Sequence, residues 1–224
     1  MLSDFFKSKV IFKFLILFAS QIIFYVSNLI TTRLLLTSYG IDFLGEVSYF
    51  FVSISIINTI LNYGLPLYGQ LTINGSKYDD LGSFNLFKTF LQIRIVLFVV
   101  VLLLLLALSY QGILKNNILI YLILYSLVYT FYIDWYLIGK ENYLLHATSI
   151  FLGKGFQLVI LLYFISLFKS PFLVYTLEIL SIFLVALSSN FLSKSLVYYK
   201  AVFTSINYSE IKLHFLKLSN SFLS

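Results

Sequence analysis

Six long apolar stretches constrain what this chain can fold into more than any other feature. Each holds roughly 20 or more mainly apolar residues, the length an α-helix needs to cross a bilayer. Lipid offers backbone groups no hydrogen-bond partner, so such a segment must be helical. With 60% hydrophobic and 11% charged residues, the chain has too little polar surface for a water-soluble domain. The sequence therefore predicts an all-α polytopic membrane bundle with spans at about Phe12–Leu36, Phe43–Leu67, Phe87–Ser109, Ile118–Leu137, Thr148–Phe168 and Phe172–Tyr198.

The basic residues predict the orientation of these spans. Of the 15 Lys and Arg residues, only Arg33, Lys115 and Lys169 fall on one side. The other twelve fall on the opposite side: Lys7, Lys9, Lys13, Lys77, Lys88, Arg94, Lys140, Lys154, Lys194, Lys200, Lys212 and Lys217. Because cytoplasmic loops carry the excess of Lys and Arg, both ends of the chain are expected in the cytoplasm. Topology thus explains the net charge of +6 without a nucleic-acid partner.

The chain divides into a six-helix transmembrane lobe at 1–199 and a more polar segment at 200–224. Apolar residues recur at helical spacing in the second segment, opposite Lys212 and Lys217: Tyr208, Ile211, Phe215, Leu218 and Phe222. This pattern is typical of an amphipathic helix. The segment is expected either to lie on the inner membrane surface or to lead into a second lobe. Gly64, Pro66 and Gly69, residue types that break or bend a helix, are expected to end the second span.

Polar residues line one face of the first two spans. In the second span Ser48, Ser55 and Asn62 recur every seven residues, with Asn58 beside them. The first span carries a similar line of Gln21, Asn28 and Thr32. One interpretation is a cavity wall. The other is hydrogen bonding between packed helices, which is common for Ser, Thr and Asn in membranes, and the sequence leaves both open.

Charged residues within the spans are candidates for function, because a charge near the bilayer centre costs roughly 3 kcal/mol or more. Glu178 lies about two turns into the sixth span, and its short side chain cannot reach the interface. It is expected to be a protonation site, an ion site or a neutral acid satisfied by neighbours such as Ser181. For Arg33, Arg94 and Lys154, lining an anion path and extending to the head groups remain equally open.

Signatures of cofactor, metal and enzyme sites are missing from the sequence. There is no cysteine, no glycine-rich phosphate loop and no nucleophile elbow. His146 and His214 have no second ligand at metal-binding spacing. We therefore expect neither a cofactor nor a metal, and no enzymatic activity.

Several helix ends carry motifs in an order that resembles the O-antigen and polysaccharide flippases of the multidrug/oligosaccharidyl-lipid/polysaccharide exporter superfamily. These motifs are Thr32-Arg33-Leu34 through Tyr39-Gly40, Phe43-Leu44-Gly45-Glu46, Asn62-Tyr63-Gly64-Leu65, Trp135 through Glu141, and the charged start of the fifth span at Lys154. The chain departs from the family in having Ile30 and Thr31 where a proline often precedes the first-loop arginine. It also holds about six helices, whereas family members usually have twelve or more in two lobes, so it resembles an N-terminal half.

The resemblance implies a multi-pass protein of the bacterial cytoplasmic membrane that moves an undecaprenyl-diphosphate-linked oligosaccharide between leaflets for O-antigen or capsular polysaccharide synthesis. It implies anion contacts from Arg33, Arg94 and Lys154, and ion or proton coupling at Glu178. The cavity wall would be Ser48, Ser55, Asn58 and Asn62. The expected partners are the lipid-linked oligosaccharide, membrane lipids, a second lobe or second copy, and other polysaccharide assembly proteins.

Two alternatives come from different classes of protein. A membrane-embedded O-antigen polymerase or acyltransferase would need an active site, and such polymerases generally carry a large outer loop, whereas the outer loops expected here are a few residues long. The third interpretation is a truncated, inactive half-transporter.

Overall fold

The computed structural model describes residues 2–75, 80–164, 170–193, 212 and 214. Within these ranges the chain is helical and contains no strand. In order along the chain, the helices are α1 (Leu2–Tyr39), α2 (Ile41–Asn62), α3 (Leu65–Gly75), α4 (Asp80–Tyr110), α5 (Asn116–Thr130), α6 (Asp134–Gly139), α7 (Tyr143–Phe164) and α8 (Pro171–Leu192).

The described residues contain six helical segments that are long and apolar enough to cross a membrane, as the sequence predicts. They are Phe14–Tyr39, Ile41–Ile73, Asn85–Tyr110, Asn116–Gly139, Tyr143–Phe164 and Pro171–Phe191. Large apolar side chains such as Leu103, Val159 and Phe191 are more than 60% exposed on their outer surfaces. Contact with lipid accounts for that exposure, so the chain is an all-α, multi-pass membrane protein.

The second span bends where the sequence carries glycine and proline. Tyr63 and Gly64 have positive φ angles of 33° and 75°, which ends α2, and Pro66 lies in the first turn of α3. The helix then continues past Gly69, so the expected end of the span is instead a bend. A side chain at Gly69 would lie 3.0 Å from the Trp135 ring, and this contact explains why a small residue is needed there.

The fourth span is interrupted without any glycine or proline. The sequence predicts one helix over Ile118–Leu137, but α5 ends at Thr130 and α6 begins at Asp134. The three residues between them, Phe131, Tyr132 and Ile133, form a non-helical link inside the bundle. Their backbone groups need partners from other helices.

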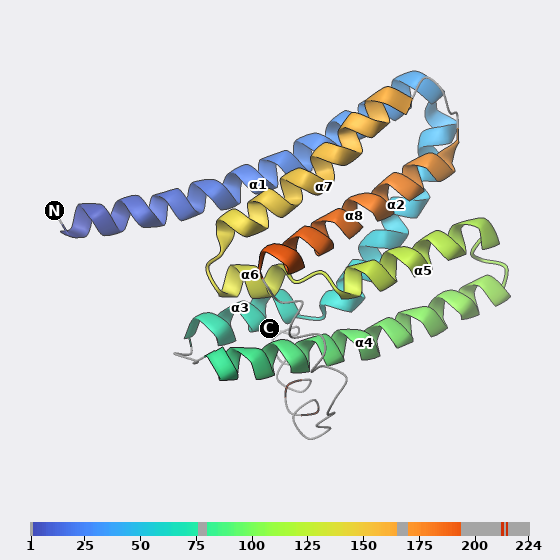
Figure 1. Ribbon diagram of the computed structural model, residues 1–224. Helices are drawn as coiled ribbons and strands as arrows, with labels where there is room; N and C mark the ends of the chain where they lie inside the picture. Colours follow the sequence, from blue (N-terminus) through green and yellow to red (C-terminus); the bar gives the residue numbers. More distant parts are fainter. Residues whose placement is uncertain (1, 76–79, 165–169, 194–211, 213, 215–224) are drawn as a thin grey trace.

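Five helices surround the interior of the bundle (Figure 1). Going around this ring, α1 packs on α7, α7 on α8, α8 on α5, α5 on α2, and α2 on α1. α4 packs outside this ring against α5 and α2, and α3 packs against α6 near one end. Because the spans alternate in direction, α2 and α5 run parallel to each other.

The contact between α7 and α8 is especially close at Gly153. A Cβ atom there would lie 2.3 Å from Val185 Cγ2 and 2.6 Å from the Ser181 carbonyl oxygen, whereas one at Gly155 would meet no atom within 4 Å. Gly153 thus permits α7 to approach α8, as small residues do between membrane helices. The next residue, Lys154, is brought directly against α8 by this approach.

Most of the predicted amphipathic segment at 200–224 lies outside the described residues, as does the expected outer loop at Lys169. Lys212 and His214 are described. The His214 ring lies 3.3 Å from the Tyr68 hydroxyl and packs edge-on against Phe90, at the end of the bundle formed by α3 and α4.

Candidate functional site

A cavity of about 670 Å³ lies between α1, α2, α5, α7 and α8, with α6 at one end. Its walls combine amide, hydroxyl, aromatic and charged side chains. The lining residues are Gln21, Phe24, Asn28, Thr31, Thr32, Ser48, Phe51, Val52, Ile54, Ser55, Asn58, Tyr125, Tyr129, Tyr132, Asp134, Ile138, His146, Ile150, Lys154, Glu178, Ser181, Ile182 and Val185.

The polar lines predicted on the first two spans meet in this cavity. Three residues of the predicted α1 line and three of the predicted α2 line are among the lining residues: Gln21, Asn28, Thr32, Ser48, Ser55 and Asn58. All except Asn58, which is half-buried, are exposed, so the cavity is open to its surroundings on the α1 and α2 side. Asn62, at the end of the α2 line, bonds between helices instead of lining the cavity.

Lys154 and Glu178 form an ion pair inside the bundle. The Lys154 ammonium lies 2.9 Å and 3.1 Å from the two carboxylate oxygens of Glu178. Gln157 completes the cluster by donating from Nε2 to Glu178 at 2.7 Å and accepting from Lys154 at 3.1 Å. Since α7 has 22 residues, about 33 Å of helix, Lys154 lies near its middle and the pair near the bilayer centre.

This geometry argues against one of the two interpretations of Lys154, the extension of its ammonium to the head groups. The residue is 6% exposed, and its ammonium turns toward α8, so it does not extend to the head groups. Its charge is further stabilised by the Phe24 ring on α1, whose centroid is 5.3 Å away. The expectation that Ser181 satisfies Glu178 is wrong, because Lys154 and Gln157 do so, and Ser181 Oγ has no hydrogen-bond partner among the described residues.

Arg94 is fully buried behind the cavity wall. Its guanidinium donates to Asn62 Oδ1 at 2.9 Å and to the backbone carbonyl of Tyr132, and it pairs with Asp134 at 3.5 Å. The guanidinium also lies over the Tyr129 ring. Arg94 therefore neither reaches the head groups nor lines the cavity. Instead it holds the link between α5 and α6 by bonding a carbonyl that the interrupted helix leaves free.

Arg33 lies apart from the other predicted site residues. It is exposed on the last turns of α1 and is not part of the cavity wall. The structure thus brings Lys154, Glu178, Ser48, Ser55 and Asn58 to one cavity, places Arg94 and Asn62 directly behind it, and leaves Arg33 outside.

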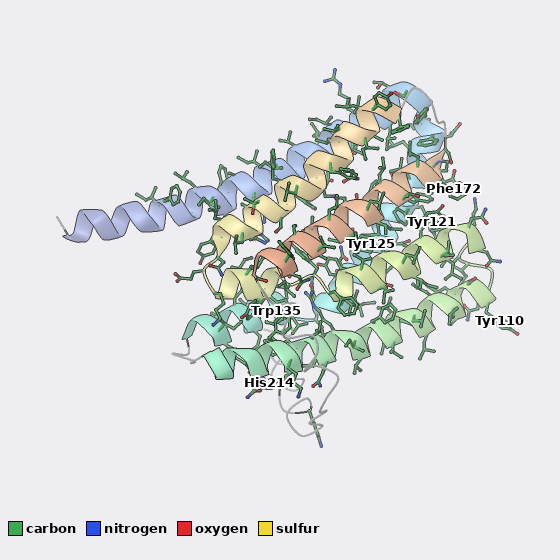
Figure 2. The ribbon with its side chains drawn as sticks, viewed as in Figure 1. Tyr110, Tyr121, Tyr125, Trp135, Phe172 and His214 are labelled. Atoms are coloured by element: carbon green, nitrogen blue, oxygen red, sulfur yellow. The ribbon has the colours of Figure 1, made fainter. Side chains whose placement is uncertain are left out.

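Sequence reasoning missed three tyrosines that form much of the wall on the α5 side. Tyr125 and Tyr129 stack with ring centroids 5.8 Å apart, and Tyr132 packs against Tyr129. Figure 2 shows Tyr125 in the interior between α5 and α8, and Trp135 on α6. The four-residue spacing from Tyr121 through Tyr125 to Tyr129 was the available signal, because it places phenols on one face of an otherwise apolar helix.

Asn58 and Asn62 of α2 hold the hydroxyls of this tyrosine row. The Nδ2 atom of Asn58 donates to Tyr125 and that of Asn62 to Tyr129, each at 3.0 Å. The polar line of α2 therefore fits both interpretations that the sequence left open, a cavity wall and hydrogen bonding between packed helices. Asn58 lines the cavity while bonding α5, and Asn62 bonds only neighbouring helices.

The charges around the cavity are balanced in pairs. Lys154 is paired with Glu178, and Arg94 with Asp134. His146, which is 4% exposed, lines the cavity near Asp134, and its Nδ1 has no hydrogen-bond partner among the described residues. In the described ranges no three His, Cys, Asp or Glu side chains gather as metal ligands do. The cavity is therefore suited to binding through hydrogen bonds and aromatic faces more than through a strong net charge.

Comparisons of the chain with protein-family models, with curated proteins and with solved structures found no match. The resemblance to polysaccharide flippases therefore stays a prediction drawn from the helix-end motifs.

Proposed function

We propose that this chain takes part in moving an undecaprenyl-diphosphate-linked oligosaccharide between the leaflets of the bacterial cytoplasmic membrane. The observation that carries the proposal is the polar cavity of about 670 Å³ inside a bundle of membrane-spanning helices. A purely structural bundle would fill this space with apolar side chains, because unsatisfied polar groups in hydrocarbon are costly. A translocation path for sugars needs hydrogen-bonding groups at the depth where this cavity lies.

The Lys154–Glu178 pair supplies a coupling device for such a path. A proton binding to Glu178 removes the negative charge that holds the Lys154 ammonium. Lys154 is then free to contact the diphosphate of the substrate, and it returns to Glu178 when the proton leaves. Substrate and Glu178 thus compete for one cation, which links proton movement to substrate movement.

The open side of the cavity supports a second lobe or a second copy of the chain as partner. Gln21, Asn28, Ser48 and Ser55 are exposed there on α1 and α2. Amide and hydroxyl groups facing acyl chains would be unfavourable, whereas a water-filled path closed by a partner would satisfy them. The charge distribution supports an orientation with the N-terminus in the cytoplasm.

Reconstitution tests this function. The full chain, placed in vesicles with a fluorescent undecaprenyl-diphosphate oligosaccharide, should move the glycan to the opposite leaflet faster than protein-free vesicles do. Expression should also restore surface polysaccharide in a strain lacking its flippase. Glu178→Gln, which mimics the protonated acid, should bind substrate but lose its response to a proton gradient. Equal rates with and without the protein, together with no restoration, would rule out this function for the chain alone and for a pair of its copies.

A further inference from the structure

Two repeated hydrogen bonds connect α2 and α5 along the cavity. Asn58 donates to Tyr125 and Asn62 donates to Tyr129, both at 3.0 Å and both across 67 residues of sequence. Because α2 and α5 run parallel, an advance of one turn on each helix reproduces the same contact. The pairs therefore form two rungs, with the tyrosine rings stacked at an interplanar angle of 16°.

Each rung leaves one phenolic proton available to the cavity. A tyrosine hydroxyl is one donor and also an acceptor, and in both rungs the asparagine amide occupies the acceptor side. Among the described residues, neither Tyr125 nor Tyr129 donates its hydroxyl proton to another group. Since both side chains line the cavity, both protons can be donated to a molecule bound there.

Further polar atoms on the same wall lack partners. Ser181 Oγ, on a residue that is fully buried, and Asn58 Oδ1 make no hydrogen bond within the described part of the chain, and both residues line the cavity. Buried polar atoms normally have a partner, and leaving one without costs about 1–3 kcal/mol. The wall thus offers two donors from tyrosine, one amide acceptor and one hydroxyl that can do either.

Arg94 contacts only one of the two rungs. Its Nη2 atom donates to Asn62 Oδ1 at 2.9 Å, whereas Asn58 Oδ1 receives no such bond. A cation bound to the amide oxygen polarises the amide N–H, which in turn makes the Tyr129 hydroxyl a better donor. Arg94 is thus a positioning residue that acts on the cavity through Asn62 and Tyr129.

The balanced charges indicate what these donors bind. Both cations near the cavity are paired with carboxylates, and Asp134 lies on the wall beside Tyr129 and Tyr132. A free anion there would meet the Asp134 carboxylate, and among the described lining residues it would find no unpaired Lys or Arg. A neutral sugar offers hydroxyls that donate and accept, and its C–H faces pack on aromatic rings.

We propose that Tyr125 and Tyr129, held by Asn58 and Asn62, are the specificity-determining residues that hydrogen-bond a neutral, hydroxyl-rich glycan in the cavity, with Arg94 positioning Tyr129 through Asn62. This inference rests on the proposed function and adds to it the part of the substrate that the cavity recognises. Lys154 binds the diphosphate once a protonated Glu178 has released the Lys154 ammonium.

Binding to the purified full chain in mild detergent tests the assignment. The probes are a panel of neutral di- to tetrasaccharides and, separately, inorganic pyrophosphate. Trp135 is the chain's single tryptophan, and although it does not line the cavity, it follows Asp134, which does, so its emission is used to report binding. Saccharides should give a saturable change that salt does not weaken, and Tyr125→Phe or Tyr129→Phe should each lower the affinity about tenfold.

Tyr121→Phe is the matched control. Tyr121 lies on the same helix but packs against Phe172 and Tyr175 outside the cavity wall, so its hydroxyl should not matter for saccharide affinity. Asn62→Asp keeps an acceptor for Arg94, but the new carboxylate accepts a hydrogen bond from the Tyr129 hydroxyl, which then no longer donates to the cavity. It should lower the saccharide affinity as Tyr129→Phe does. The double variant, Asn62→Asp with Tyr129→Phe, should lose no more affinity than either single variant.

Three results would overturn the assignment. They are a response to pyrophosphate alone, a response to no saccharide, and equal affinities for Tyr121→Phe, Tyr125→Phe and Tyr129→Phe. Saccharide binding without movement of lipid-linked glycan in vesicles would refute the proposed function but leave the assignment intact. Glycan movement without saccharide binding would support the proposed function and refute the assignment.

Discussion

Lys154 of α7 and Glu178 of α8 face each other with the ammonium nitrogen 2.9 Å from one carboxylate oxygen and 3.1 Å from the other. Both residues are at least nine-tenths buried, and the pair lies near the middle of the membrane-spanning helices. Its partners are a glutamine on α7 and an aromatic ring on α1, so three helices meet at this point of the cavity.

The first prediction concerns the mutual dependence of this pair. Lys154→Met and Glu178→Leu should each destabilise the protein by about 3 kcal/mol, because each leaves one buried charge without its partner. The double variant should be more stable than either single variant. Thermal unfolding in detergent measures the effect, and additive losses in the double variant would show that the two charges act independently.

The second prediction uses the two glycines beside Lys154. Gly153→Ala should destabilise the protein by roughly 1–3 kcal/mol, because the added Cβ would overlap Val185 and the Ser181 carbonyl. Gly155→Ala is the matched control. It adds the same atom into open space and should be neutral or stabilising by up to about 1 kcal/mol, since alanine favours helix. Equal melting temperatures for the two variants would contradict the close α7–α8 contact.

The third prediction concerns the link between α5 and α6. Arg94→Met removes the donor to the Tyr132 carbonyl and the partner of Asp134, so it should cost about 3 kcal/mol and loosen the link. Trp135, which is 1% exposed beside this link, should then shift its emission to longer wavelength. Arg33→Met, at an exposed position, should change stability by no more than about 0.5 kcal/mol and leave the emission unchanged. An unshifted Trp135 in Arg94→Met would remove the structural role given to Arg94.

The fourth prediction tests the orientation. Because the chain has no cysteine, single cysteines can be introduced and labelled in intact cells with a maleimide that does not cross membranes. Gln111→Cys, in the turn after α4, should react from outside. Glu141→Cys, in the turn between α6 and α7, should react only after the membrane is permeabilised. The opposite pattern would reverse the topology that the basic residues predict.

Much of the architecture could be predicted because the bilayer restricts the choices. A run of apolar residues such as Asn85–Tyr110 has no alternative to a membrane helix, and the structure agrees for six segments. Gly64 and Pro66 signalled the bend in the second span. The interruption after Thr130 carried no such signal, since its stability depends on Arg94 from another helix.

The site was harder to predict for the same reason. Seven-residue spacing indicated the polar face of α2, because that pattern is local to one helix. The partner of Glu178 is not local. Ser181, one turn away on the same helix, was the expected neighbour, whereas Lys154 is 24 residues distant and reaches it only because Gly153 brings α7 against α8. Pairing across helices depends on rotation and depth, which periodicity does not specify.

Accessibility of the cavity to water tests the account most directly. Ser55→Cys and Ile56→Cys are adjacent on α2 and both exposed, but Ser55 lines the cavity and Ile56 does not. A thiol reacts as thiolate, which forms in water and not in hydrocarbon. A small, charged methanethiosulfonate reagent should therefore modify Ser55→Cys at least tenfold faster than Ile56→Cys in membranes. Equal rates, or faster modification of Ile56→Cys, would mean that the polar stripe does not line an aqueous cavity and would contradict the proposed path.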